Sequence, residues 1–252
     1  MNLQEEGLIM GSVKDCIKYI LNFAGFVFHH NRRSKIVYYH DVGVQYTKMG
    51  TPLKIIDEQI NEMRACGFEI VPHLTCHNNQ VMIAFDDGWK GLYDEKDYFI
   101  AKGIRPTIFI AVDLIGKDGY MTIDEIRQLQ DKGFIFESHT WSHKGLPDFK
   151  TDTDLKHELV DSKNQLEVLL NTEITSLCFP QGRFSSKVIE MSQKAGYKDL
   201  YSSIPGGAYD LEKDGILCRN LFAEVPVNQV KFVLEGVSFL FRSKLIKEHI
   251  SK

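Results

Sequence analysis

The chain has 252 residues, of which 43% are apolar and 25% charged, and its formal net charge is −4. This length suffices for one substantial core, and the charge gives no reason to expect nucleic acid as a partner. Five scattered cysteines, an odd number without a CxxC pair, argue against a disulfide framework and favour a reducing, cytoplasmic location.

Residues 1–34 are expected to form an amphipathic N-terminal helix followed by a basic segment. Residues 1–6 lack the basic start of a secretory signal, so no signal peptide is recognised. The apolar stretch 17–28 is too short to span a bilayer, which requires roughly 20 residues. This helix, and a similar one expected near the C-terminus, could pack on the outside of the domain or lie in a membrane interface. Peripheral membrane contact through both termini is therefore an alternative to simple packing.

From residue 35 onward, short apolar runs alternate with longer helical patterns. The expected strands cover residues 35–40, 69–71, 81–85, 106–112, 134–138, 176–180, 200–203 and 216–219. The expected helices cover residues 53–66, 91–102, 122–131, 153–170, 185–195 and 228–242. This alternation predicts an α/β fold with parallel strands, arranged as a barrel or an open doubly wound sheet. Because no repeat or linker interrupts it, residues 35–252 are expected to form a single domain that ends in the C-terminal amphipathic helix.

Two carboxylates end the expected strand 81–85. Adjacent residues at the end of a strand point in different directions, so Asp86 and Asp87 need not do the same work. One could bind a cation while the other accepts a proton from water. Asp-Gly is also a favoured turn dipeptide, and on its own Asp87-Gly88 is typical of a turn.

Two histidines four residues apart follow the expected strand 134–138. His139 and His143 at this spacing are suitable ligands for zinc and similar metals, although a chance pair among nine histidines is easy to obtain. With Asp87 they make three protein ligands and leave a position open, as in catalytic metal sites. Zinc is the default metal for this set, and cobalt, nickel or iron fit the same ligands.

These two segments resemble the first two motifs of the polysaccharide deacetylases, the NodB-homology or carbohydrate esterase family 4 proteins. Residues 84–88 match the pattern (T/A)FDDG, and residues 139–143 match H(S/T)xxH. The resemblance runs from about residue 35 to 222. It implies a distorted (β/α) barrel and metal-dependent removal of acetyl groups from N-acetylated sugars of a polysaccharide or oligosaccharide. By position, it implies that Asp86 is the general base and that Asp87, His139 and His143 hold the metal.

Other motifs of the family are present only in part. Residues 178–182 are similar to the motif that ends in PYG, which implies that the backbone N–H of Gln181 faces the oxyanion and that Gly182 and Trp141 lie near the substrate. The arginine expected just before the proline is missing, and residues 216–219 lack the histidine that serves as general acid. A Tyr-His element at the first strand is similar to one in deacetylases of biofilm and cell-surface glycans. It makes His40 a candidate acid, unless His40 is a strand-end histidine held by Asp41.

Two alternatives to an active glycan deacetylase remain open at this point. The missing arginine and late histidine are consistent with a catalytically impaired, carbohydrate-binding barrel. The apolar and basic termini are consistent with a deacylase that acts on a lipid-linked sugar at the membrane surface.

Overall fold

The computed structural model describes residues 20, 23–24, 26–27, 30–236 and 250–251. Its centre is an eight-stranded parallel sheet in the order β10-β8-β7-β6-β5-β1-β11, with β4 also paired to β5. The strands are β1 (Lys35–Tyr39), β4 (Glu69–Val71), β5 (Gln80–Asp87), β6 (Thr107–Ile110), β7 (Ile135–Ser138), β8 (Ser176–Cys178), β10 (Asp199–Tyr201) and β11 (Asn220–Leu221). All their carboxyl ends therefore meet at one edge of the sheet.

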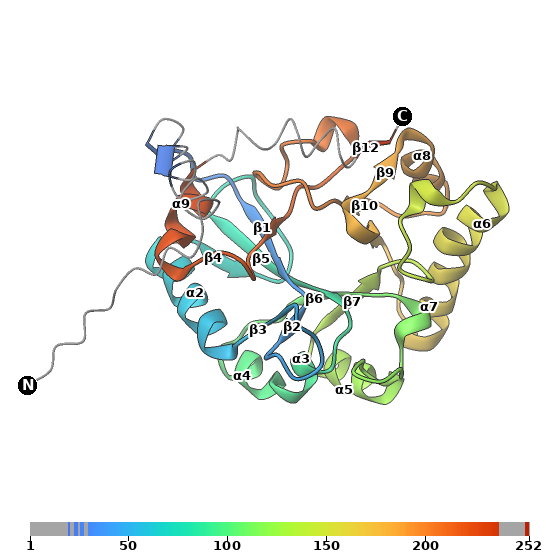
Figure 1. Ribbon diagram of the computed structural model, residues 1–252, viewed down its shortest axis with the longest axis horizontal. Coiled ribbons are helices and arrows are strands. Elements are labelled where there is room, and N and C mark those ends of the chain that lie inside the picture. Colours follow the sequence, from blue (N-terminus) through green and yellow to red (C-terminus); the bar gives the residue numbers. More distant parts are fainter. Residues whose placement is uncertain (1–19, 21–22, 25, 28–29, 237–249, 252) are drawn as a thin grey trace, which may run out of the picture.

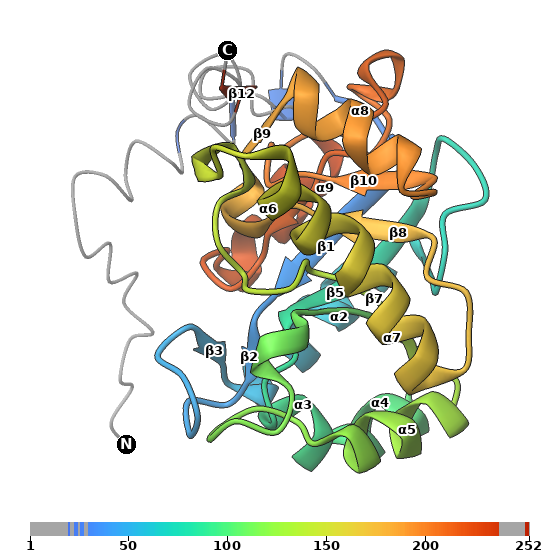
Figure 2. The ribbon, with the colours of Figure 1, turned by 90° about the vertical axis from the view of Figure 1, so that its right-hand side faces the viewer.

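Helices cover the outside of this sheet, which curls into a half-barrel (Figures 1 and 2). They are α2 (Leu53–Ala65), α3 (Gly91–Asp94), α4 (Lys96–Ala101), α5 (Ile123–Asp131), α6 (Asp152–Lys156), α7 (Ser162–Leu170), α8 (Ser186–Lys194) and α9 (Val230–Glu235). Short pairs β2 (Asp41–Val42) with β3 (Gly50–Thr51), and β9 (Phe184–Ser185) with β12 (Ile250–Ser251), lie off the main sheet. The predicted single-domain α/β architecture is thus observed as an open, distorted barrel.

The two faces of the sheet bury different clusters of apolar side chains. Val37 and Tyr39 belong to the large cluster that packs against the helices. Ile36 and Tyr38 belong to a smaller cluster that also contains Phe109. Because side chains alternate along a strand, a strand buried on both faces reads as an unbroken apolar run, which is the pattern that located β1 and β5 in the sequence.

Three predicted elements differ from the structure. Residues 216–219 do not form a strand, because the backbone N–H groups of Cys218 and Arg219 donate to Ala208 and Ile204, and pairing with β1 begins only at Asn220. The helix predicted over 91–102 breaks into α3 and α4 at Glu95. The helix predicted over 153–170 contains a π-helical turn, His157–Asp161, between α6 and α7.

The basic end of the N-terminal segment packs against α9. Arg32 donates from Nη1 to Glu235 at 2.9 Å, and the rings of Phe26 and Phe232 lie 5.4 Å apart. Residues 1–19 and 237–249, which include most of the predicted N-terminal helix and the end of the predicted C-terminal helix, lie outside the described residues. Contact of the termini with a membrane therefore stays a prediction. Within the described ranges, every helix is too short or too polar to cross a bilayer.

Candidate active site

Asp86 lies inside the half-barrel and is paired with a buried arginine. Because side chains alternate along β5, Asp86 points to the same face as Ala84, which belongs to the smaller apolar cluster. Arg219 donates from Nη1 and Nη2 to the two Asp86 oxygens, at 2.7 and 2.8 Å. The side chain of Arg219 is 0% exposed and that of Asp86 6%. The pair is a desolvated, bidentate ion pair of the kind that fixes a carboxylate in one orientation.

This pairing decides the charge of Asp86. Burial alone would raise the pKa of Asp86, but the Arg219 guanidinium overrides burial and holds the pKa below its ordinary value. The guanidinium is itself held, since its Nε donates to the Ser202 carbonyl at 3.0 Å and its carbon lies 4.2 Å from the centre of the Tyr38 ring. Asp86 is consequently an ionised carboxylate at neutral pH. Oδ2 also faces the Cys178 thiol at 4.0 Å, whereas Oδ1 keeps a second lone pair that can accept a proton.

Asp87 lies at the mouth of the barrel with the two predicted histidine ligands. Its Oδ1 is 3.0 Å from His143 Nε2 and 3.5 Å from His139 Nε2. Its φ of 71° ends the regular alternation of β5. Burial would raise the pKa of Asp87, but the contacts with His139 and His143 hold it well below its ordinary value. The structure thus brings together the three residues that the sequence predicted as metal ligands.

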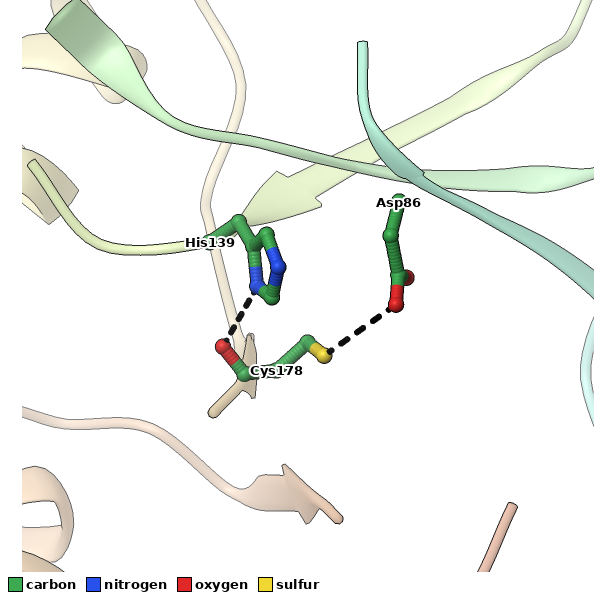
Figure 3. A group of neighbouring side chains, drawn as sticks. All are labelled: Asp86, His139 and Cys178. Carbon is green, nitrogen blue, oxygen red and sulfur yellow. Dashed lines mark hydrogen bonds between the residues drawn. The ribbon is translucent and has the colours of Figure 1, made fainter. Parts of the chain in front are cut away.

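The orientation of His139 leaves one ring nitrogen free for a metal. His139 Nδ1 lies 2.8 Å from the carbonyl oxygen of Cys178 (Figure 3). A carbonyl can only accept, so Nδ1 carries the proton and Nε2 presents its lone pair to Asp87 Oδ1. In the neutral imidazole, a cation placed between these two acceptors would satisfy both. The buried Asp87 Oδ1 also has no aligned hydrogen-bond donor, which fits a site for a divalent metal.

A second cluster, Asp86, His139 and Cys178, also has metal-ligand chemistry (Figure 3). Two observations argue against it. Both Asp86 oxygens are already bound by Arg219, and a metal would be placed beside that cation. Burial also raises the pKa of the Cys178 thiol well above its ordinary value, so the sulfur is protonated. Of the two clusters, Asp87, His139 and His143 therefore have the donor chemistry that suits a divalent metal.

The loop that carries both histidines is held by Glu158, which sequence reasoning missed. The Glu158 carboxylate accepts from the backbone N–H groups of Trp141 and Ser142 at 3.1 and 3.0 Å, and from the Ser142 hydroxyl at 2.6 Å. Glu158 lies on the π-helical turn between α6 and α7. Thr140 and His143 in this loop have φ of 71° and 60°. Left-handed backbone at a β-branched residue is strained, and such strain is characteristic of functional sites.

His40 follows β1 at the same edge of the sheet. The last register pair of β1 and β5 is Tyr39 with Phe85, so His40 stands one residue beyond it, as Asp86 does. His40 Nδ1 is buried without a hydrogen-bond partner. The alternative in which Asp41 holds His40 is not observed, because Asp41 Oδ1 accepts from the backbone of Val42 and Leu92. His40 is thus placed near the base, with its ring edge-on to that of Tyr38 at 5.9 Å between ring centres.

Gln181 borders the metal-ligand cluster, whereas Trp141 makes other contacts. A cavity of about 280 Å³ is lined by His143, Lys144, Gly145, Asp148, Phe149 and Gln181. Gln181 has a φ of 59°, and Gly182 next to it a φ of 67°. Trp141 donates from Nε1 to Asp113 at 3.0 Å and is not among the residues that line this cavity. Contact of Gln181, Gly182 and Trp141 with substrate stays a prediction.

Arg219 is the other functional residue that the sequence interpretation missed. The arginine sought before Pro180 is absent, and Arg183, on the other side, forms a bidentate pair with the exposed Asp148. The guanidinium beside Asp86 comes instead from the segment before β11. A charged residue at the end of the apolar run 216–219 was the available signal, since a buried arginine needs a partner.

Comparisons with known proteins show the family to which this chain is related. Residues 73–200 match the family model described as Polysaccharide deacetylase. The YxkH protein of Bacillus subtilis (strain 168), whose name assigns it to the same family, is 29% identical over 129 residues, or 51% of this chain and 46% of that protein. The chain spans about half the length of the curated relatives it matches.

Solved structures of deacetylases share the fold. The Streptococcus pyogenes deacetylase PplD in complex with acetate superimposes with a TM-score of 0.71 at 18% identity, over 81% of this chain and 99% of that chain. A polysaccharide deacetylase from Bacillus cereus gives a TM-score of 0.69 at 19% identity, over 81% of this chain and 69% of that chain. These likenesses confirm the curled-sheet architecture that the sequence predicted.

Proposed function

The chain belongs to the polysaccharide deacetylase family, and from this premise we propose that it is a metal-dependent hydrolase that removes acetyl groups from N-acetylated sugars of a polysaccharide or oligosaccharide. The observation that carries the proposal is the convergence of Asp87, His139 and His143 beside the ionised Asp86. Three nitrogen and oxygen ligands with an adjacent proton acceptor are the requirements for metal-assisted hydrolysis of an amide.

The residues of the chain divide the reaction between them. Asp86 accepts a proton from the water molecule whose oxygen forms a bond with the acetamide carbonyl carbon. Backbone N–H groups near Gln181 donate to the oxyanion that results. The C–N bond then breaks, and His40 gives a proton to the departing sugar nitrogen. Acetate and a free amino sugar are the products.

A divalent cation held by Asp87, His139 and His143 would polarise the carbonyl and lower the pKa of water at the site. Zinc suits one carboxylate and two imidazoles, and cobalt, nickel or iron are accepted by the same donors. The protein's own contribution is to orient these donors, through the Cys178 carbonyl at His139 and through Glu158 at the loop.

Acetate release from N-acetylglucosamine oligomers tests the proposal. We expect wild-type protein loaded with zinc, cobalt, nickel or iron to release acetate, and the same protein treated with a chelator to release none until metal is restored. If no acetylated saccharide yields acetate with any of these metals, the enzymatic proposal fails for those substrates. Trying neutral, charged and lipid-linked acetylated sugars in one assay also separates the main proposal from a deacylase of a lipid-linked sugar.

Removing either histidine ligand is expected to remove the metal. His139→Ala and His143→Ala should each weaken zinc binding by about 10- to 100-fold or more, because each deletes one of three donors. Zinc content after dialysis, measured by elemental analysis, is the readout. His157→Ala is the matched control, since His157 pairs with the exposed carboxylate of Asp161 outside the cluster. Full zinc occupancy in both ligand variants would contradict the assignment.

The acid role of His40 predicts a dependence on the leaving group. His40→Gln should slow amide hydrolysis by about 10²- to 10⁴-fold, because an amine must be protonated to leave. Hydrolysis of 4-nitrophenyl acetate should change far less, since nitrophenolate leaves without a proton. His77→Gln, at an exposed histidine that packs on Tyr209, is the control and should alter neither rate. Equal losses on both substrates would rule out the acid role.

The catalytically impaired alternative is weakened by Arg219. Its main support was the missing arginine beside the base, and the structure supplies a guanidinium with two contacts to the Asp86 carboxylate. The late histidine is still absent, so acetate release by the wild type decides between an active and an impaired barrel, and the His40 experiment tests whether His40 supplies the acid.

A further inference from the structure

The two carboxylate oxygens of Asp87 have different surroundings. Oδ2 accepts a hydrogen bond from the indole Nε1–H of Trp89 at 3.1 Å. Oδ1 is buried, receives no aligned hydrogen bond, and faces His139 and His143. The side chain of Asp87 is only 4% exposed, so solvent does not compete for either oxygen. One oxygen is thus already bound by the protein and the other is left for a cation.

The indole that makes this contact is itself held in place. The Trp89 ring stacks on Tyr120, with ring centres 4.0 Å apart and an angle of 25° between the planes. The two residues also form an antiparallel β-bridge. On either side of Trp89, the Lys90 N–H donates to Gly119 at 2.9 Å, and the Gly88 carbonyl accepts from Met121 at 3.0 Å. The segment 88–90 is therefore clamped to the segment 119–121, which fixes the direction of the indole N–H.

Side chains pack closely against Gly88 and Gly119, the glycines in the two clamped segments. A Cβ at Gly88 would lie 2.8 Å from the Ile110 side chain, and one at Gly119 would lie 3.2 Å from the Trp89 ring. Lys90 extends the clamp to α5 through an ion pair with Glu125 at 2.8 Å. The Trp89 ring has little room to move away from Asp87.

We propose that Trp89 is a positioning residue for the metal site: its indole N–H holds Asp87 Oδ2, so that the carboxylate offers a metal Oδ1 alone. The inference rests on the metal site proposed above and extends it to a residue outside the ligand set. Donors that bind the second atom of a ligand fix its rotation and strengthen metal binding, and losing one costs about 10- to 100-fold in affinity. Binding through one oxygen also keeps a coordination position free for water and the substrate carbonyl.

Zinc affinity of the metal-free protein tests this role without relying on turnover. Chelator-stripped protein is titrated with zinc against a chromophoric competitor, for wild type and Trp89→Phe. Phenylalanine keeps an aromatic ring for Tyr120 but has no N–H, so the dissociation constant should rise by about 10- to 100-fold. The matched control is Tyr98→Phe, because Tyr98 also donates from an aromatic side chain to a carboxylate, that of Asp57 at 2.7 Å, which is not a proposed ligand. The control should bind zinc as wild type does.

A second variant separates the hydrogen bond from the packing of the ring. Replacing Trp89 by 3-benzothienylalanine substitutes sulfur for the N–H in a ring of the same size, and it should weaken zinc binding as Trp89→Phe does. Wild-type affinity in this variant, or an equal loss in Tyr98→Phe, would overturn the proposal. Failure of the wild-type protein itself to bind zinc would instead remove the metal site, and this inference with it.

Discussion

Asp86→Asn is expected to lower the rate of acetate release by about 10²- to 10⁴-fold while the protein keeps its metal. Asparagine has nearly the shape of aspartate, but its amide cannot take the proton of the attacking water. The buried Asp86 makes no contact with the metal-ligand nitrogens that the structure describes, so zinc content should be unchanged. The measurement pairs initial rates of acetate release with elemental analysis of the same samples.

The neighbouring residue provides the matched control for this substitution. Asp87→Asn makes the same chemical change one residue along, where we expect the loss to be in zinc affinity, because the amide is a far weaker ligand than a carboxylate. The two variants should thus separate turnover from binding. An Asp86→Asn protein that is fully loaded with zinc and keeps more than about a tenth of the wild-type rate would contradict its role as general base.

Arg219→Met is expected to destabilise the fold at neutral pH by about 3–5 kcal/mol, because it leaves a buried carboxylate without its partner. Methionine fills part of the arginine volume, so the cavity contribution is reduced. The free energy of unfolding from denaturant titration is the readout. Arg183→Met is the control: Arg183 has the same bidentate geometry toward Asp148, but at the surface, where the loss should be much smaller.

The stability of Arg219→Met should depend on pH, because the pKa of Asp86 is lowered when Arg219 is present and raised when it is absent. In the wild type the pKa is held below its ordinary value, so the stability from the pair is present above the pKa of the unfolded chain and is lost as the pH falls through the folded pKa. Without Arg219, burial raises the pKa of Asp86, and the folded protein binds a proton more readily than the unfolded chain. The deficit of Arg219→Met should therefore be largest near pH 7–8 and shrink toward acid pH.

The raised pKa of Asp86 in Arg219→Met should also appear in the pH dependence of activity. A base with a raised pKa is ionised only at higher pH, so the acidic limb of the pH–rate profile should move upward in Arg219→Met. The double variant Asp86→Asn/Arg219→Met removes both charges and should be more stable than Arg219→Met alone. An acidic limb that does not move, or a double variant no more stable than the single one, would show that Arg219 does not control the charge of Asp86.

The chain by itself determined the architecture and the metal half of the site. Apolar runs that stop at polar residues located β5 and β7, and their parallel arrangement brings Asp87, His139 and His143 to one edge of the sheet. These features could be predicted because they depend on local pattern and on the rule that parallel strands end at the same edge. Even there, the strand predicted over residues 216–219 was wrong, since the backbone of Cys218 and Arg219 bonds to Ala208 and Ile204 and only Leu217 forms a bridge with β10.

Only the tertiary structure decided what supports the two aspartates. Arg219 lies 133 positions from Asp86 along the chain, and nothing in the local pattern connects them. Phe179 stands just before Pro180, where the arginine was expected, and the sulfur beside Asp86, at 4.0 Å, is that of Cys178. Likewise, the contacts of Trp89 and Trp141 depend on which carboxylate each ring meets. Charge pairing and hydrogen bonding between distant segments are set by packing of the whole barrel, so the sequence indicated which residues to propose for the reaction and the fold determined how they are held.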